Sequence, residues 1–566
     1  MFTLGPLMAH PQLERLETTL STVSLSLGSI RNAFAPINAL PRETLAHIFK
    51  IFASFTSTPS SFLADITPHA KENPNAWLVV THVCQFWRET AFAFPSLWSP
   101  IDSTYPSAAL AFLERSSTSP LRVYLRDTVL QSGLVPALDR TQFLQTVSQH
   151  SPRFVELHLQ PQFRYGPAIL RFFRYPAPQL KALTISLNIG RDEQPDLPTL
   201  FGGQTPNLEK LTLCNFSSWP GNPTLGAHLT HLCLYDQHPR GRLTMEGFIA
   251  ILATCPRLEE LILVEAGPRV VPTAYDSSWL DSPREHELLD LHNLRTLHLG
   301  NWTSHAVIAR FLSHLILPQS TSVHIWADCL FHSTDTLTTL LPASTTHLHP
   351  LHGITVVHLL YRPTLRDSPQ LLAVSDQVLV IHFYYVASTA ENVLLSVFSK
   401  IDLRNIEELT IGVDCEPEMP SERWRPIFKA MPRLRKLNIL RRPSGRILSA
   451  LGTAPHSGDL DLVCPALSSI TITDDRALSP IRLFLVAETR SRLGTPLQSL
   501  RIVTTISHLH YSSQNQKMID EIEDLKGYIR QVQYVENDQE LKLPLGWPSS
   551  AFKWVMARKK VQGSMT

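Results

Sequence analysis

A short apolar phrase recurs along most of the chain. It consists of one apolar residue, two residues of any kind, Leu or Ile, one further residue, and Leu or Ile again. The instances begin at Phe154, Leu180, Leu208, Leu229, Leu258, Leu294, Ile406, Leu434, Leu467 and Leu497. The last two apolar residues of a phrase alternate with one other residue, as in a strand with one buried face. Recurrence on this scale predicts stacked repeats, each adding one short strand to a shared parallel sheet.

Helical patterns lie between the phrases, at 247–254, 305–315, 392–399, 423–430 and 481–490. Strand, loop, helix and loop form the unit of a leucine-rich repeat, so we predict an irregular α/β solenoid over 120–512. Its parallel strands would line the inside of an arc and its helices the outside. The interval between phrases varies from about 21 to about 36 residues, and the pattern leaves the register of 326–377 open. A helical pattern at 518–534 predicts a cap within 513–566.

The beginning of the chain carries helical patterns instead. Pro41 suits a first helical position, and Glu43 would meet the positive end of the helix dipole. The apolar face of this first helix has residues three and four positions apart: Leu45, Ile48, Phe49 and Phe52. A second helix, stopped by Pro95, is predicted from a similar seam: Trp77, Val80, Cys84, Trp87 and Ala91. Two short helices cannot bury this much aromatic surface alone, so they need the rest of the chain or another protein.

The stretch 37–98 resembles an F-box. The first half of that motif is matched by Leu40, Pro41, Glu43, Leu45, Ile48 and Phe49, and the second half by Val83, Cys84, Trp87, Arg88, Pro95, Leu97 and Trp98. A polar insertion at 53–76 separates the two halves. With the repeats behind it, the chain resembles the fungal F-box proteins that carry C-terminal leucine-rich repeats and act as substrate receptors.

The resemblance implies a partner for each region. A Skp-family linker protein, and through it the cullin of an SCF-type ubiquitin ligase, would bind Leu40, Pro41, Leu45, Ile48, Phe49, Val83, Cys84 and Trp87. The repeats would bind a protein substrate, and the chain would perform no bond chemistry and need no cofactor. The alternative is a leucine-rich repeat scaffold that binds proteins without any ligase.

The residue between the last two apolar positions of each phrase would face outward from the inner side of the sheet. We take eight of these ten positions as the candidate substrate surface: His158, Thr184, Thr212, Ile262, His298, Thr410, Asn438 and Arg501. Their mixed character, without one sign of charge, fits a protein better than phosphate or nucleic acid. For the histidines in or near the strands, a ligand site is one interpretation, and a side chain facing solvent is the favoured one.

Residues 1–36 and 99–119 flank the predicted F-box. In the first segment Leu13, Leu16, Leu20, Val23, Leu27 and Ile30 form a heptad-like seam. We expect that helix to pack on the neighbouring module, with self-association as a short coiled coil as the alternative. The second segment is expected to be a linker with a short helix at 109–114.

Composition narrows the function further. The 50 basic and 49 acidic residues give a net charge of +1, which lacks the basic footprint of a nucleic-acid binder. No apolar run reaches the eighteen or so residues that cross a bilayer. Seven cysteines without CxxC pairs suggest reduced thiols, hence a cytoplasmic or nuclear protein, and several would be small buried hydrophobes. The cysteines and histidines are too dispersed to predict a metal site, and no catalytic motif is found.

Overall fold

The computed structural model describes residues 11–56, 75–126, 137–160, 166–187, 194–219, 226, 228–269, 288–300, 302, 305–327, 340–361, 370–375, 379–383, 395, 398–413, 419–440, 445–452, 462–473, 478, 480–505 and 523–537. The chain divides into two compact units. The first holds the described residues up to Leu183 together with 200–205. The second holds those from Thr184 to Thr199 and from Pro206 onward.

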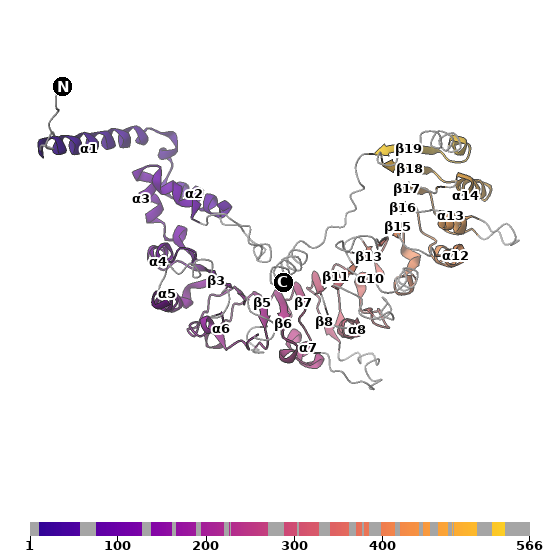
Figure 1. The fold of residues 1–566 in the computed structure, drawn as a ribbon, viewed down its shortest axis with the longest axis horizontal. Helices are drawn as coiled ribbons and strands as arrows, with labels where there is room; N and C mark the ends of the chain where they lie inside the picture. The colour runs from indigo at the N-terminus through magenta and orange to yellow at the C-terminus, as the bar shows by residue number, and fades with distance from the viewer. Residues whose placement is uncertain are drawn as a thin grey trace, which may run out of the picture. The chain divides into compact units, whose positions relative to one another are not determined.

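The first unit begins with helices, and Figure 1 labels α1, α2 and α3 among them; the short 3-10 helices are written η here. They are α1 (Pro11–Ala33), η1 (Pro36–Ala39), α2 (Arg42–Thr56), η2 (Ala76–His82), α3 (Gln85–Ala93) and η3 (Pro95–Trp98). The second predicted helix is therefore wrong as a single element. Cys84 has an extended backbone, with φ −159° and ψ 170°, between η2 and α3. The β-branched run Val79, Val80 and Thr81 disfavours a continuous α-helix here because such side chains lose rotamer freedom.

An aromatic cluster forms the core around these helices. The ring of Trp98 lies 5.1 Å from that of Trp77 and 4.9 Å from that of Phe112, both in edge-on contact. The indole N–H of Trp98 donates to the carbonyl of Ala91 at 2.8 Å, which satisfies its polar atom inside the core. Because Phe112 belongs to α4 (Pro106–Arg115), the helical module is packed against the chain that follows it.

The predicted linker at 99–119 is instead largely regular structure. Besides α4, it contains β1 (Pro100–Asp102), which pairs in parallel with β2 (Leu121–Arg126). No phrase marks β1, and it is too short for its alternation to stand out. The unit continues through α5 (Ala137–Gln149), η4 (Ser151–Arg153), β3 (Phe154–Gln160) and α6 (Gly166–Leu170), and includes η7 (Leu200–Gly203); the division between the units falls within β4 (Ala182–Ser186).

The second unit is built on parallel strands. They are β5 (Lys210–Phe216), β6 (His231–Gln237), β7 (Glu260–Val264), β9 (Thr296–Gly300), β11 (Ser322–Ala327), β12 (Val356–Tyr361), β14 (Leu379–Phe383), β15 (Glu408–Val413), β16 (Lys436–Leu440), β17 (Ser469–Thr473), β18 (Ser499–Thr505) and β19 (Gln531–Asn537). The phrases pair position by position, as with Leu409, Leu437, Ile470 and Leu500. The predicted parallel strand ladder is confirmed for β5, β6, β7 and β9 and for β15 to β18.

One strand departs from the parallel order. β13 (Gln370–Ser375) lies antiparallel between β12 and β14, in the region whose register the sequence left open. β14 pairs with β11 on its other side, and β12 with β15. A separate two-stranded parallel pair consists of β8 (Leu289–Asp290) and β10 (Leu315–Ile316).

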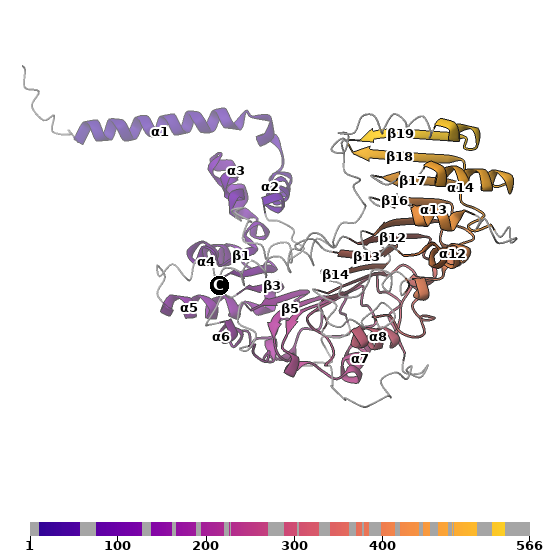
Figure 2. The same cartoon turned by 45° about the vertical axis from the view of Figure 1, so that its right-hand side comes forward.

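Helices accompany the strands of the second unit on one side (Figures 1 and 2). They are α7 (Met245–Ala253), α8 (His305–Ser313), α10 (His349–His352), α12 (Ser421–Lys429), α13 (Gly445–Leu451) and α14 (Pro480–Arg492), with the short helices η9 (Pro239–Gly241), η12 (Leu403–Asn405) and η14 (Asp524–Gly527). The predicted helices at 247–254, 305–315, 423–430 and 481–490 are confirmed. The prediction at 392–399 lies mostly outside the described residues.

The predicted C-terminal helical cap is wrong over its described part. After η14 the chain forms β19, which pairs in register with β18. Val532 and Tyr534 alternate with Gln531 and Gln533, a strand pattern that prevails over the helical spacing before it. Leu525 and Ile529 are buried as the pattern required, but they lead into a strand. The ladder thus extends past residue 512, while the rest of the expected cap lies outside the described residues.

Helix α1 also departs from expectation. The seam residues Leu16, Leu20, Val23, Leu27 and Ile30 are 51% to 64% exposed. The favoured interpretation, that this helix packs its seam on the neighbouring module, is therefore wrong. The module satisfies its core with Trp77, Trp98 and Phe112 and leaves the seam of α1 uncovered.

Candidate protein-binding surfaces

A recurring turn sets the start of each repeat strand. The residue between the last two apolar positions of a phrase is called displayed here, and the side of the sheet that carries these residues is the displayed face. The backbone N–H of the first apolar residue of a phrase donates to the carbonyl three residues earlier: Leu258 to Cys255 at 3.2 Å, Leu434 to Met431 at 3.2 Å, and Leu467 to Cys464 at 3.0 Å. The strand that follows then pairs with its neighbours over the whole phrase. Because the turns are equivalent, the displayed residues of successive strands fall into line.

The register gathers the predicted substrate residues into two runs within the second unit. Thr212, Ile262 and His298 lie on one run, through Cys233 of β6. Thr410, Asn438 and Arg501 lie on another. Strands β11, β14, β13 and β12 separate the two runs, so the predicted set does not form one contiguous patch.

Burial differs sharply among these positions. Thr184, Ile262, His298 and Thr410 are buried; His158, Thr212 and Asn438 are half-buried; Arg501 is exposed. The favoured view that the strand histidines face solvent is wrong for His298, which is 7% exposed. Its ring stacks on that of His324 from the next strand, with centroids 4.6 Å apart, since side chains on paired strands pack laterally.

Burial keeps both stacked rings neutral at ordinary pH. Loss of hydration lowers the pKa of His298 to about 3, helped by the repulsion that a protonated His324 would exert, and lowers the pKa of His324 to about 4. A neutral imidazole pair of this kind adds no positive charge to this part of the sheet, and its half-buried member is His324. This part of the displayed face is accordingly suited to apolar or hydrogen-bonding contacts.

The second run is held by polar contacts among its own members. The amide of Asn438 donates to Glu408 at 2.9 Å and to the hydroxyl of Thr410 at 3.1 Å. Lys436 forms an ion pair with Glu408 at 3.5 Å. These contacts fix the side chains in place, so a partner would meet a preformed polar surface here.

In the first unit, His158 belongs to a small cluster on β2 and β3. Its ring stacks on Tyr124 with centroids 4.9 Å apart, and its Nε2 lies 3.8 Å from Glu156. Arg122 pairs with the same carboxylate at 3.5 Å. The hydrogen bond with His158 lowers the pKa of Glu156, together with the charge of Arg122, while burial opposes the shift. The cluster presents a carboxylate beside two aromatic rings.

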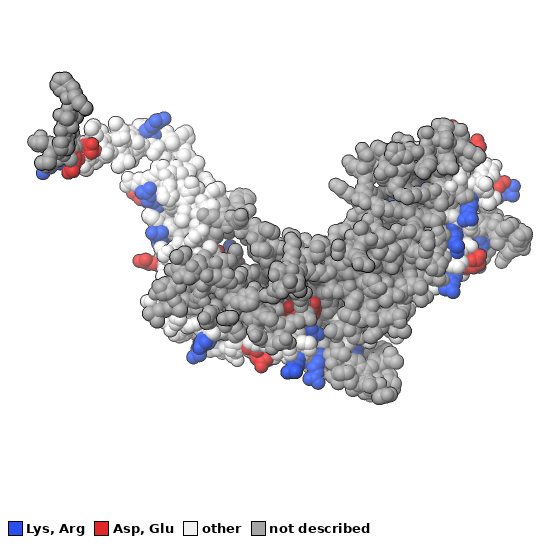
Figure 3. Space-filling view, viewed as in Figure 1, with Lys and Arg blue, Asp and Glu red and all other residues white. Residues whose placement is uncertain are grey.

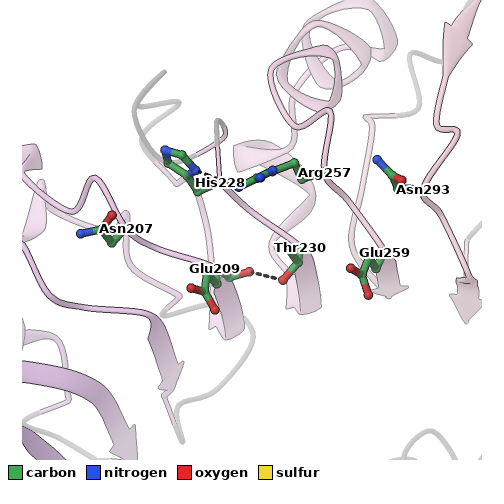
Figure 4. Close-up of a pocket in the computed structure, with 7 residues that line it drawn as sticks. All are labelled: Asn207, Glu209, His228, Thr230, Arg257, Glu259 and Asn293. Carbon is green, nitrogen blue, oxygen red and sulfur yellow. Dashed lines mark hydrogen bonds between the residues drawn. The ribbon is translucent and has the colours of Figure 1, made fainter.

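Sequence reasoning missed a polar hollow of about 450 Å³ in the second unit. Its residues flank the first apolar position of successive phrases and form two rows in Figure 4: Asn207, His228, Arg257 and Asn293 in one, Glu209, Thr230 and Glu259 in the other. The guanidinium of Arg257 lies 3.4 Å from Nδ1 of His228, and Thr230 donates to the carbonyl of Glu209 at 3.0 Å. The signal in the sequence was a pair of polar residues, one directly before and one directly after the first Leu of each of these phrases.

The helical module exposes an apolar band, defined here as Ile48, Ile51, Phe52, Val79 and Val83. These residues of α2, of η2 and of the position just after η2 are 39% to 56% exposed. The apolar sector of α2 is wider than the surface that covers it, so one edge is buried and the other is not. Figure 3 shows the face that carries α1 to α3 as largely uncharged. An exposed group of apolar side chains of this kind marks an interaction site.

The predicted linker-binding residues divide along this edge. Pro41, Ile48 and Val83 are exposed, and Leu40, Cys84 and Trp87 are half-buried. Leu45 and Phe49 are buried at 0% and 1% exposure, so a direct contact by these two is wrong. Phe49 packs on Trp87 at 5.1 Å, and the Trp87 N–H donates to Asn38 at 2.6 Å. Leu45 and Phe49 therefore support the band from beneath.

Comparisons with known proteins add little to this geometry. No family description matches the chain, and no curated protein does. Among solved structures, the leucine-rich repeat-containing protein LegL7 from Legionella pneumophila is similar over 71% of this chain and 98% of its own. Its sequence identity is 11% and its TM-score 0.21. At that score the two chains do not superpose as one fold, so the repeat architecture rests on the phrases and the strand register.

Other classes of site are sparse in the part of the chain that the structure describes. No group of three or more His, Cys, Asp or Glu side chains that could hold a metal ion occurs there. Cys214, Cys255 and Cys464 are buried as predicted, and burial raises the pKa of Cys464 to about 12. None of the described helices combines the length and apolar character needed to cross a membrane.

Proposed function

We propose that this protein is the substrate-recognition subunit of an SCF-type ubiquitin ligase. Its helical module would dock on a Skp-family linker protein, which joins it to a cullin. The displayed face of the repeat strands would hold a protein substrate. The chain itself performs no bond chemistry under this proposal; it raises the concentration of substrate near another protein's active site.

The apolar band is the observation that carries the proposal. Leu45 and Phe49 are buried, yet Ile48 and Ile51 on the same helix remain exposed. Leaving several large apolar side chains in water costs free energy that a partner groove would recover, at roughly 25 cal/mol per Å² of apolar surface covered. Two members of the band, Ile48 and Val83, are among the residues that resemble an F-box, so the resemblance and the exposure favour the same partner.

The repeat face supports the second half of the proposal. Parallel strands with fixed polar contacts, such as those of Asn438 and Glu408, make a preorganised surface for protein recognition. Beside the other run, the half-buried ring of His324 on β11 stacks on the buried ring of His298 and stays neutral. Mixed surfaces of this kind suit a protein substrate better than a polyanion.

The test is co-purification of the full-length chain with a recombinant Skp-family linker protein. Ile48→Glu places a charge in the band and should lower retention at least about tenfold, since each tenfold corresponds to 1.4 kcal/mol. Leu40→Ala combined with Pro41→Ala should act in the same direction. Leu110→Glu, at an exposed apolar residue of α4 outside the band, is the matched control and should bind like the unmodified chain.

Circular dichroism of each variant separates lost binding from lost folding. Retention of the linker protein by folded Ile48→Glu would contradict docking through the band. No binding of the unmodified chain would favour the alternative, a repeat scaffold that uses the module only as an amino-terminal cap. Under that alternative, substitutions at Leu40 and Pro41 leave all protein partners of the chain unaffected.

A further inference from the structure

Helix α1 carries a second exposed apolar surface, separate from the band. Its members, here called the α1 seam, are Leu16, Leu20, Val23, Leu27 and Ile30, all more than half exposed. The hydroxyls of Thr18, Thr19, Thr22 and Ser26 each donate to the backbone carbonyl four residues earlier. The polar side of the helix is thus satisfied internally, whereas the seam has no cover among the described residues.

The spacing of the seam identifies the kind of surface that fits it. Successive members are four, three, four and three residues apart, an average of 3.5, which is the period of two helices wound around each other. A helix that lies on a globular core follows the wider 3.6-residue stripe instead. Leu25, which is 76% exposed, lies off the seam and breaks no register.

An antiparallel second copy matches this seam residue by residue. A two-fold axis between positions 21 and 22 sets Leu16 against Leu27 of the other copy and Leu20 against its Val23. Every interior layer then joins an a position to a d position, as antiparallel pairs require. Ile30 continues the seam at both ends, and the helix dipoles run in opposite directions.

The charges favour the same orientation. Glu14 and Glu17 lie on one flank of the seam near its start, and Arg31 lies on that flank near its end. Antiparallel pairing about this axis sets Arg31 of each copy opposite position 12 of the other, about 3 Å along the helix axis from its Glu14 and on the flank that also carries its Glu17. In a parallel pair, Arg31 would instead face Ser26 of the other copy, which carries no charge, and would have no acidic partner.

We infer that α1 is a dimerisation element that binds α1 of a second copy of this chain in antiparallel orientation. The interface is short, so the dimer dissociates on dilution. Its two-fold symmetry presents two helical modules and two repeat faces per assembly. This inference does not depend on the proposed ligase role, because it involves neither the band nor the displayed strands.

Sedimentation of the full-length chain over a range of concentrations tests the association. The unmodified chain should shift from monomer to dimer as concentration rises. Leu20→Lys should raise the dissociation constant at least about tenfold. Leu25→Lys introduces the same charge on the same helix off the seam, and it should leave the constant unchanged. A chain that stays monomeric at every concentration, or equal constants for the two variants, would overturn the proposal.

Cross-linking tests the orientation. Leu16→Cys and Leu27→Cys chains, mixed and oxidised, should form a disulfide between the two different variants, mapped by mass spectrometry of the α1 peptides. Leu16→Cys alone should not cross-link to itself through α1, since an antiparallel pair separates the two positions. A self-cross-link at residue 16 would overturn the antiparallel arrangement. Arg31→Glu should weaken the dimer, and adding Glu14→Arg and Glu17→Arg should restore it.

Discussion

In strands β15 to β18 the last two apolar residues of each phrase, from Leu409 to Ile502, are at most 3% exposed. In α2, by contrast, Leu45 is fully buried while Ile48, one turn away, is 39% exposed. Both regions use Leu and Ile at regular spacing. The ladder repeats its unit until each apolar face is covered by the next, whereas the helical module ends with one edge uncovered.

This difference in coverage indicates which side chains of each region are available to a partner. A stacked repeat can bury all its leucines and still offer a surface, because the residues between them point the other way. A small helical module has no second face, so under the proposed function its binding surface is the part of its own apolar sector that it leaves exposed. Exposed apolar side chains therefore indicate a site in the module, and displayed polar ones indicate a site in the ladder.

The largest effect should come from the aromatic core of the module. Trp98→Ala removes a fully buried ring that contacts Trp77 and Phe112, and it should lower the free energy of unfolding by roughly 3–5 kcal/mol. Urea unfolding followed by circular dichroism measures it. Phe34→Ala, at a residue 83% exposed, should stay within about 0.5 kcal/mol. A loss of less than about 1 kcal/mol of unfolding free energy in Trp98→Ala would mean that the aromatic cluster is not the main source of the module's stability.

The ladder should prove sensitive to a buried cation instead. The guanidinium of Arg490, which is 0% exposed, donates to the carbonyls of Val463 at 3.1 Å, Cys464 at 3.0 Å and Leu467 at 3.0 Å. Burial lowers the pKa of Arg490, and these carbonyls compensate the buried charge. Arg490→Leu leaves them without donors and should cost on the order of 3 kcal/mol in urea unfolding.

Arg492 offers a matched control on the same helix. Its exposed guanidinium pairs with Glu488 at 2.7 Å, and surface pairs contribute about 0–1 kcal/mol. Arg492→Leu should therefore change stability far less than Arg490→Leu. Equal losses of unfolding free energy in the two variants would mean that the turn after Val463 does not need the buried guanidinium of Arg490. The contrast between a ladder stabilised by buried hydrogen bonds and a module stabilised by aromatic packing would then weaken.

The sequence predicts the ladder well because one residue pattern is repeated, so that each copy independently supports the same strand assignment. It fails where a feature occurs once: β1 has three residues and no phrase, and the antiparallel β13 has no counterpart. It also misses the left-handed backbone of Asn215, Asp236 and Glu265, each two residues after a phrase, because no glycine marks these positions.

The candidate sites are predicted less well for a related reason. Helical spacing shows that Leu45, Ile48 and Phe49 belong to one apolar sector, but which edge is covered depends on tertiary contacts such as Phe49 with Trp87. Likewise, alternation shows that His298 is displayed, yet its burial depends on the ring of His324 in the next strand. Periodicity gives the direction of a side chain and leaves its neighbours undetermined.

The smallest effect should appear as a pH dependence confined to the ladder. Burial depresses the folded-state pKa of His298 to about 3 and of His324 to about 4, against an unfolded value near 6.5. The unfolded chain thus binds protons between these values that the folded chain does not. Stability from these rings is fully present above pH 6.5 and is lost as pH falls toward 4 and then 3. Each histidine should contribute a slope of roughly 1.4 kcal/mol per pH unit within that window.

Urea unfolding at pH 6 and pH 5 measures the slope of the unfolding free energy against pH. In His324→Gln this slope should be smaller by the contribution of one histidine, roughly 1.4 kcal/mol per pH unit. Ile262→Val, at an equivalent displayed position without a titratable group, should keep the slope of the unmodified chain. If His324→Gln keeps it too, the stacked pair is hydrated in solution, and the displayed face of the ladder is more open than its burial indicates.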